Sequence, residues 1–257
     1  MTAPLGGVLL FAIVKDIAEL VLAITGIYFA LVVIVKWRQP WVQRLKQQRL
    51  LVLWVIVLGV LLAKVSEDVL ALESGPVDEA VLAWIHTAVP SSLLGLFQAA
   101  TLSASSTVIF VLLAVSTAAL LAVHQRFESL VLGSSVLAAV SLVYVVKTLV
   151  GRERPALWET QWYWGASFPS GHTMTSAAFA TAACICVTRR WPRARWPAFA
   201  IATLWVSLVA LSRLVLGAHW PTDVLAAACA GVLVALAADA TLLVLRQRYA
   251  IRAEKQA

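Results

Sequence analysis

The chain has 257 residues, of which 61% are hydrophobic and 13% are charged, and its formal net charge is +7. Soluble domains average about 25% charged residues, so the composition excludes an ordinary soluble protein and favours a polytopic helical membrane protein. Because the cations collect at the ends of apolar stretches, they indicate membrane topology, and we expect no nucleic-acid partner.

Seven apolar segments are close to or within the range of about 17–25 residues that a helix needs to cross a bilayer. The predicted spans are Ile17–Val35, Leu50–Lys64, Thr107–Val123, Ser129–Val146, Thr173–Thr188, Trp196–Arg213 and Val224–Leu245. Between the second and third spans, Pro76–Pro90 predicts a short amphipathic helix on the outer surface, with Asp78, Glu79 and His86 as its polar residues. The expected fold class is all-α.

Charge alternates between the connecting segments. The segment 36–49 carries Lys36, Arg38, Arg44, Lys46 and Arg49 without an acid, and the segment 189–195 and the tail 246–257 are also basic. The segment 67–79 is acidic and contains no Lys or Arg. Because cytoplasmic loops are enriched in Lys and Arg, this pattern places the N-terminus outside and the C-terminus in the cytoplasm.

Three clusters of polar residues stand at the ends of apolar stretches, and the predicted topology puts all three on the extracytoplasmic face. They are Lys147 with Arg154-Pro155, then Pro169-Ser170-Gly171-His172, then Ser212-Arg213 with His219 and Asp223. Together they hold fixed cations, two imidazoles, a carboxylate and a glycine turn, which are the groups that bind a phosphate and transfer a phosphoryl group.

The first cluster places cations where the positive-inside rule disfavours them, so an anionic ligand is expected there. A lone lysine such as Lys147 can also simply extend to the interface, but Arg152 and Arg154 follow within seven residues. The planar fork of an arginine suits the two oxygens of a phosphate. Arg152 and Glu153 are interpreted as solvated or paired.

The second cluster opens the fifth span and can be understood as an ordinary helix start capped by Ser170. A helix N-terminus also offers free backbone N–H groups and a dipole that favours an anion. Gly171 allows the backbone to approach a phosphate oxygen, and His172 can exchange a proton near neutral pH.

The third cluster carries the most specific chemistry. His219 and Asp223 are four residues apart where the last span begins, so Asp223 can accept a hydrogen bond from one ring nitrogen and leave the other as a nucleophile. The structural alternatives are a first-turn acid favoured by the helix dipole and an interfacial histidine beside Trp220.

The combined pattern, with no core position missing between Lys147 and Asp223, resembles the signature of the type 2 phosphatidic acid phosphatase family, which is related to the vanadium haloperoxidases. The resemblance covers about Leu50 to Leu245. It implies a six-helix membrane bundle with one extra N-terminal helix. The expected regions are 1–49, an N-terminal transmembrane helix with a basic cytoplasmic loop; 50–245, the catalytic membrane domain; and 246–257, a basic cytoplasmic tail.

The resemblance also implies a role for each motif residue. His219 would attack phosphorus and form a phosphohistidine, Asp223 would orient His219, and His172 would protonate the leaving oxygen. Phosphate would be bound by Lys147, Arg154, Ser170, Gly171 and Arg213. Neither a metal nor another cofactor is expected, because the fixed cations would stabilise the transition state.

The leading functional hypothesis is a lipid phosphatase, a phosphoric ester or diphosphate hydrolase, of a bacterial inner membrane. Its substrate would be undecaprenyl pyrophosphate, phosphatidylglycerophosphate or phosphatidate, hydrolysed at the extracytoplasmic face among the membrane lipids. One alternative is a phosphotransferase that passes the phosphoryl group to a lipid or sugar hydroxyl. The other is a non-catalytic lipid-binding or transport protein. The sequence leaves the oligomeric state open.

Overall fold

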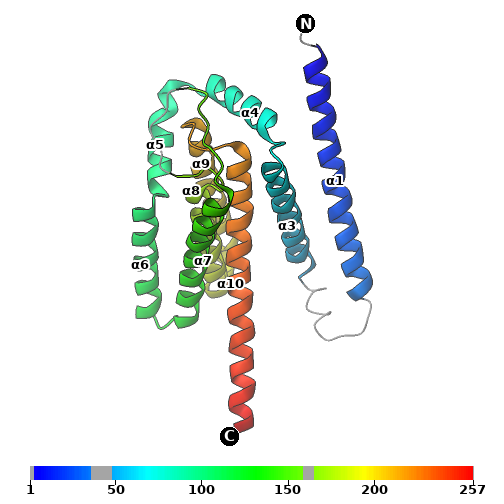
Figure 1. Cartoon of the computed structure of the whole chain (residues 1–257). Coiled ribbons are helices and arrows are strands. Elements are labelled where there is room, and N and C mark those ends of the chain that lie inside the picture. The colour runs from blue at the N-terminus through cyan, green and yellow to red at the C-terminus, as the bar shows by residue number, and fades with distance from the viewer. Residues whose placement is uncertain (1–2, 36–47, 159–164, 257) are drawn as a thin grey trace. The chain divides into compact units, whose positions relative to one another are not determined.

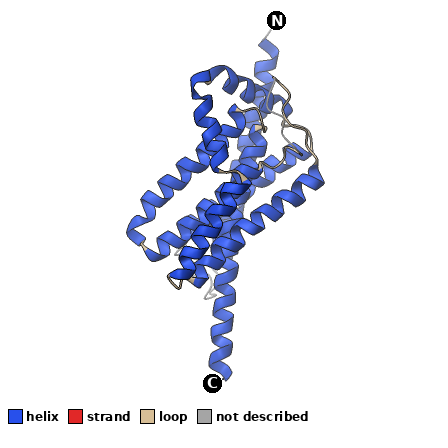
Figure 2. Ribbon diagram, turned by 90° about the vertical axis from the view of Figure 1, so that its left-hand side faces the viewer, coloured by secondary structure: helices blue, strands red, loops and turns tan. Residues whose placement is uncertain are grey.

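A computed structural model describes residues 3–35, 48–158 and 165–256. These residues form helices and contain no β-strand (Figures 1 and 2). The all-α prediction is therefore confirmed. Most of the predicted basic loop 36–49, including Lys36 and Lys46, lies outside the described residues.

The chain separates into two compact units, Met1–Val77 and Asp78–Ala257. The first unit contains α1 (Ala3–Val35) and α3 (Arg49–Leu70), which pack against each other. Lys64 of α3 lies 2.9 Å from the carboxylate of Asp68 and 3.5 Å from that of Asp16 on α1. This ion-pair cluster joins α1 to α3.

The second unit contains the remaining helices. In chain order they are α4 (Gly75–Ala88, which begins just before the unit boundary), the short 3-10 turn η1 (Ser91–Leu93), α5 (Leu94–Ser103), α6 (Ser106–Ala122), α7 (Arg126–Val150), α8 (Gly171–Arg190), the 3-10 turn η2 (Pro192–Ala194), α9 (Arg195–Val215) and α10 (Pro221–Gln256). Each of the seven predicted spans coincides with one helix of the chain. Most ends differ by a few residues, and longer extensions occur at the start of α1 and at the end of α10.

The central helix of this unit is α8, which packs against α6, α7, α9 and α10. Small residues such as Ala177, Ala178 and Ala182 are buried along it. The contact with α10 is tight, because a Cβ added to Gly231 would lie 2.4 Å from the carbonyl oxygen of Met174. Small residues at helix contacts let membrane helices approach closely, and here they hold α8 in the middle of the bundle.

The helices α4 and α5 precede this bundle and correct two expectations. The predicted amphipathic helix exists as α4, but Asp78 is not on its exposed side: it is 0% exposed and shares the buried face with Leu82 and Ile85. Asp78 can be buried because it bonds to Arg152 and to Thr222 at the start of α10. The ten-residue helix α5 was not predicted, because it is too short to give a membrane-span signal, and it follows α4 after a bend of 93°.

Among the described helices, four are long and apolar enough to cross a membrane: Arg49–Leu70, Arg126–Val150, Pro192–Val215 and Pro221–Ala253. The bent pair formed by α4 and η1–α5 passes the same test when it is taken together. These helices support an integral membrane protein.

Candidate active site

The three polar clusters meet at one end of the second unit, where α7 ends, α8 begins and α9 turns into α10. Gly151 terminates α7 in the left-handed conformation, with φ of 64°, and its N–H donates to the carbonyl of Lys147 at 3.1 Å. Glycine adopts this conformation without the steric cost of a Cβ. The turn directs the following residues, including Arg154, toward the α9–α10 connection.

Arg154 is held in place by backbone carbonyls. Its Nε donates to Gly165 at 2.9 Å and its Nη1 donates to Ala218 at 2.6 Å. The same Nη1 lies 3.3 Å from Nε2 of His219. Lys147 donates to the carbonyl of Ala166. The two cations of the first motif are therefore anchored to the segment that leads into α8.

His219 lies in the turn between α9 and α10 and is 2% exposed. Its Nδ1 is 3.5 Å from Oδ2 of Asp223 and 3.4 Å from the hydroxyl of Ser167, which itself donates to Oδ2 of Asp223. A guanidinium can only donate, so Nε2 facing Arg154 acts as the acceptor and the neutral ring carries its proton on Nδ1. This tautomer follows from the partners of each nitrogen.

Burial lowers the pKa of His219 from 6.5 to about 4, although the neighbouring Asp223 carboxylate favours the charged ring. The imidazole is therefore neutral at pH 7. A neutral ring with an unprotonated Nε2 is the form of histidine that can act as a nucleophile.

Asp223 is completely buried and also caps the helix on which it lies. Its Oδ2 accepts a hydrogen bond from the backbone N–H of Trp220 at 2.9 Å, three residues earlier. This contact is one half of a capping box, which satisfies a backbone donor that the helix itself leaves free. The backbone carbonyl of Asp223 accepts from the N–H of Ser170 at 3.2 Å, so α10 and the start of α8 are directly joined.

The remaining predicted site residues lie around this turn. Arg213, in the last turn of α9, is 3% exposed and donates to the hydroxyl of Thr101 on α5. Ser170 stands immediately before α8, with its hydroxyl 3.1 Å from that of Thr173. His172 is half-buried and is close enough to interact electrostatically with both Arg213 and His219. The structure thus brings the three motifs together.

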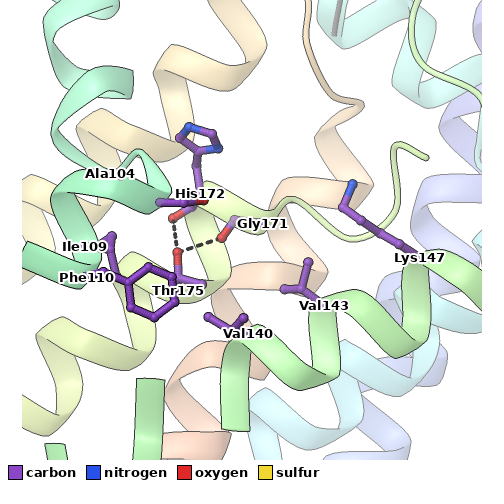
Figure 3. Close-up of a pocket in the computed structure, with 10 residues that line it drawn as sticks. Ala104, Ile109, Phe110, Val140, Val143, Lys147, Gly171, His172 and Thr175 are labelled. Atoms are coloured by element: carbon purple, nitrogen blue, oxygen red, sulfur yellow. Dashed lines mark hydrogen bonds between the residues drawn. The ribbon is translucent and has the colours of Figure 1, made fainter. Parts of the chain in front are cut away.

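A cavity of about 220 Å³ opens beside His172 (Figure 3). Lys147 and His172 line it, together with apolar residues of α6 and α7 that include Ile109, Phe110 and Val143. In Figure 3 the hydroxyl of Thr175 bonds to the carbonyl of Gly171 at 2.8 Å. The cavity therefore places polar motif residues next to an apolar lining.

Four further residues of the site were not predicted: Asp78, Arg152, Ser167 and Thr222. Nη1 of Arg152 donates to Oδ1 of Asp223 at 2.7 Å and Nη2 donates to Oδ2 of Asp78 at 2.6 Å. Of the two alternatives for Arg152, solvated or paired, the structure shows the paired one. The one sequence signal for Asp78 was its spacing, since it precedes Leu82 by four residues and Ile85 by seven, on one helical face.

Among the residues that the structure describes, no group of three or more His, Cys, Asp or Glu side chains is arranged to hold a metal ion. The charged groups gathered at the site are mostly cations, which suit an anion as ligand.

Curated relatives match a short part of the chain. It is 48% identical over 63 residues to phosphatidylglycerophosphatase B of Escherichia coli strain K12, and equally similar to the protein of the same name from Shigella flexneri. The match covers 24% of this chain and 24% of each relative, so it spans about a quarter of the length of these curated relatives.

Two solved structures share the fold over a larger part of this chain than the curated relatives match. The PAP2 type phosphatidylglycerolphosphate phosphatase of Bacillus subtilis superposes with a TM-score of 0.64 at 23% identity, covering 74% of this chain and 94% of that one. LpxE of Aquifex aeolicus gives a TM-score of 0.51 at 23% identity over 62% of this chain and 92% of its own. Residues 128–247, from α7 to α10, match the family described as the PAP2 superfamily. This region, which carries all three motifs, is where the chain is similar to the PAP2 superfamily.

Proposed function

We propose that this protein is a membrane phosphatase that removes phosphate from a lipid, with His219 as the nucleophile. The observation that carries the proposal is the placement of His219. Its buried, neutral ring has Nδ1 beside Asp223 and Nε2 beside the guanidinium of Arg154. A phosphate bound by Arg154 would therefore lie next to the lone pair of Nε2.

In the proposed reaction, Nε2 of His219 attacks phosphorus while the bond from phosphorus to the lipid oxygen breaks. Asp223 stabilises the imidazolium that forms, as the carboxylate of a catalytic triad does. His172 acts in its protonated form, as an imidazolium, and donates its proton to the departing oxygen. Water then attacks the phosphohistidine, giving up a proton to His172, and inorganic phosphate leaves with His219 restored.

The phosphate oxygens would be bound by the cations around the turn, Lys147, Arg154 and Arg213, together with Ser170 and the N–H of Gly171 at the start of α8. Because these groups are already fixed by other contacts, as Arg154 is by backbone carbonyls, little reorganisation is needed when charge develops on phosphorus. No metal takes part in the proposed mechanism.

A lipid substrate is supported by the cavity beside His172. Lys147 and His172 line it together with several apolar residues, so a phosphate could meet the cations while the adjoining lipid lies against Ile109 and Phe110. The names of the relatives favour phosphatidylglycerophosphate as substrate. Undecaprenyl pyrophosphate and phosphatidate remain the other candidates.

The charge pattern of the connecting segments supports a site on the extracytoplasmic face of a bacterial inner membrane. In that position the enzyme would act on lipid phosphates of the outer leaflet, and its basic C-terminal tail would lie in the cytoplasm.

The decisive experiment measures phosphate release by the purified full-length protein in detergent, in excess chelator, with the three lipid phosphates offered separately. We expect release that persists with chelator and disappears in His219→Ala. Loss of release on chelation would contradict the metal-free mechanism. Consumption of substrate without free phosphate would favour the phosphotransferase, and binding without consumption would favour a lipid-binding protein.

A further inference from the structure

Asp78 is a buried carboxylate that comes from outside the family's matched region. It lies on α4, 74 residues before Arg152, and is 0% exposed. Burial of a charged group is costly unless it is paired and hydrogen-bonded. Asp78 meets this requirement with Nη2 of Arg152 at 2.6 Å and with the hydroxyl of Thr222, also at 2.6 Å.

The third partner of Asp78 is the start of α10. Its Oδ1 accepts from the backbone N–H of Thr222 at 3.0 Å. Thr222 is the second residue of α10, so this N–H is one of the donors that a helix cannot satisfy internally. Asp78 therefore caps α10 from another helix, while Asp223 caps the same helix at Trp220.

Arg152 connects the two carboxylates. Nη1 binds Oδ1 of Asp223 at 2.7 Å and the hydroxyl of Thr222 at 2.8 Å. Because Oδ1 of Asp223 is occupied in this way, its Oδ2 is turned toward Nδ1 of His219 and the hydroxyl of Ser167. The orientation of the carboxylate beside the proposed nucleophile thus depends on Arg152, and the orientation of Arg152 depends on Asp78.

We infer that Asp78 is a positioning residue for the proposed reaction: through Arg152 and Thr222 it fixes the carboxylate of Asp223 and, through that carboxylate, the tautomer of His219. The inference rests on the proposed function. It also gives α4, which lies outside the three motifs, a defined role in the site.

The kinetic test compares Asp78→Asn with Glu79→Gln, the matched control. Glu79 is the next residue on α4 and is exposed. Its replacement by glutamine removes the same charge as Asp78→Asn does. For Asp78→Asn we expect kcat to fall about 10-fold to 100-fold, with KM changed less than about threefold, since indirect partners of a catalytic group commonly have effects of this size. Glu79→Gln should retain wild-type kcat.

A double-mutant cycle separates positioning from general destabilisation. If Asp78 acts through Asp223, the double variant Asp78→Asn/Asp223→Asn should be little slower than Asp223→Asn alone. Losses that multiply would overturn the inference, as would wild-type kcat in Asp78→Asn. If Asp78→Asn fails to fold, Thr222→Val provides the second test, because it removes the hydroxyl that contacts both Asp78 and Arg152. This variant should also lower kcat. An unchanged kcat in Thr222→Val would overturn the inference.

A second readout does not depend on activity. The chain has four histidines, so the ring nitrogens of His219 can be assigned by NMR of ¹⁵N-histidine-labelled protein with His219→Gln as reference. We expect the Nδ1–H tautomer in the wild type and a mixed or altered population in Asp78→Asn. An unchanged tautomer would contradict the inference. Inactivity of the wild type toward every lipid phosphate would count against the proposed function and leave this result standing.

Discussion

The burial of a neutral imidazole makes stability depend on pH in a definite direction. The pKa of His219 is about 4 in the folded protein and 6.5 in an unperturbed chain. Between these values the unfolded chain binds a proton that the folded protein does not, so the free energy of unfolding falls as pH decreases from 6.5 toward 4. For one group the slope is at most about 1.4 kcal/mol per pH unit.

This dependence can be measured with His219→Gln, which lacks the titrating ring. We expect the melting temperature of the wild type in detergent to fall more between pH 7 and pH 5 than that of His219→Gln. Above pH 7 the two melting curves should shift in parallel. A constant difference between the proteins from pH 7 to pH 5 would show that His219 is not buried as a neutral group.

Arg154 illustrates why charge alone does not make the site. Its guanidinium donates to the backbone carbonyls of Gly165, Ala166 and Ala218 and contacts Nε2 of His219. The single ammonium of a lysine cannot reproduce this fork. We expect Arg154→Lys to lower kcat/KM about 100-fold, a typical loss for one oxyanion-stabilising donor. Phosphate release assays give the ratio, with Arg126→Lys at an exposed arginine of α7 as control. Near-normal kcat/KM in Arg154→Lys would mean that only the charge matters.

The motif residues were predictable because each is a polar group at an apolar segment's end. Their common location followed from topology alone. Asp78, Ser167 and Thr222 were not predictable in the same way, since acids and hydroxyls in loops and at helix starts are ordinary. Their importance comes from tertiary contacts such as the bond from Ser167 to Asp223, which no local pattern encodes.

At the scale of elements, the contact between α8 and α10 limits what the bundle tolerates. A Cβ on Gly231 would meet backbone atoms of α8, with the carbonyl oxygen of Met174 at 2.4 Å and the nitrogen of Ala178 at 3.1 Å. Backbone cannot rotate away as a flexible side chain can. We expect Gly231→Ala to destabilise the protein by about 1–3 kcal/mol.

The matched control is Gly133→Ala. Gly133 lies inside α7, and an added Cβ there has nothing within 4 Å. Alanine is the better helix former, so this variant should be neutral or stabilised by up to about 1 kcal/mol. Thermal unfolding of both variants in the same detergent makes the comparison. Equal effects of the two substitutions would show that helix propensity, not the α8–α10 contact, determines the outcome.

The helices themselves were predicted well because long apolar runs identify them directly. The α4–α5 region was predicted less completely. Its amphipathic pattern indicated a surface helix, but a pattern cannot tell that Asp78 is buried against Arg152, because the partner is distant in sequence. The ten residues of α5 are too few to stand out from a loop. Tertiary packing, rather than the local sequence, determines whether a buried acid has an ion-pair partner and whether so short a segment is helical.

At the scale of the whole molecule, the proposed site lies in one of the two compact units. The matched family region lies entirely within the second unit, which contains every residue of the proposed site. The first unit is held together by its own charged cluster around Lys64. Activity and the attachment of α1 can therefore be altered separately, by substitutions in different parts of the chain.

The orientation in the membrane decides which leaflet supplies the substrate, and single cysteines can establish it. Glu79→Cys on α4 and Arg248→Cys near the end of α10 both replace exposed residues. If the charge pattern sets topology, a membrane-impermeant maleimide should label Glu79→Cys in intact cells and Arg248→Cys only after lysis. The parent chain is the control, since Cys186 and Cys229 are buried and Cys184 is half-buried. The reverse labelling would move the site to the cytoplasmic leaflet, and the proposed chemistry at His219 would then act on lipids presented from the inside.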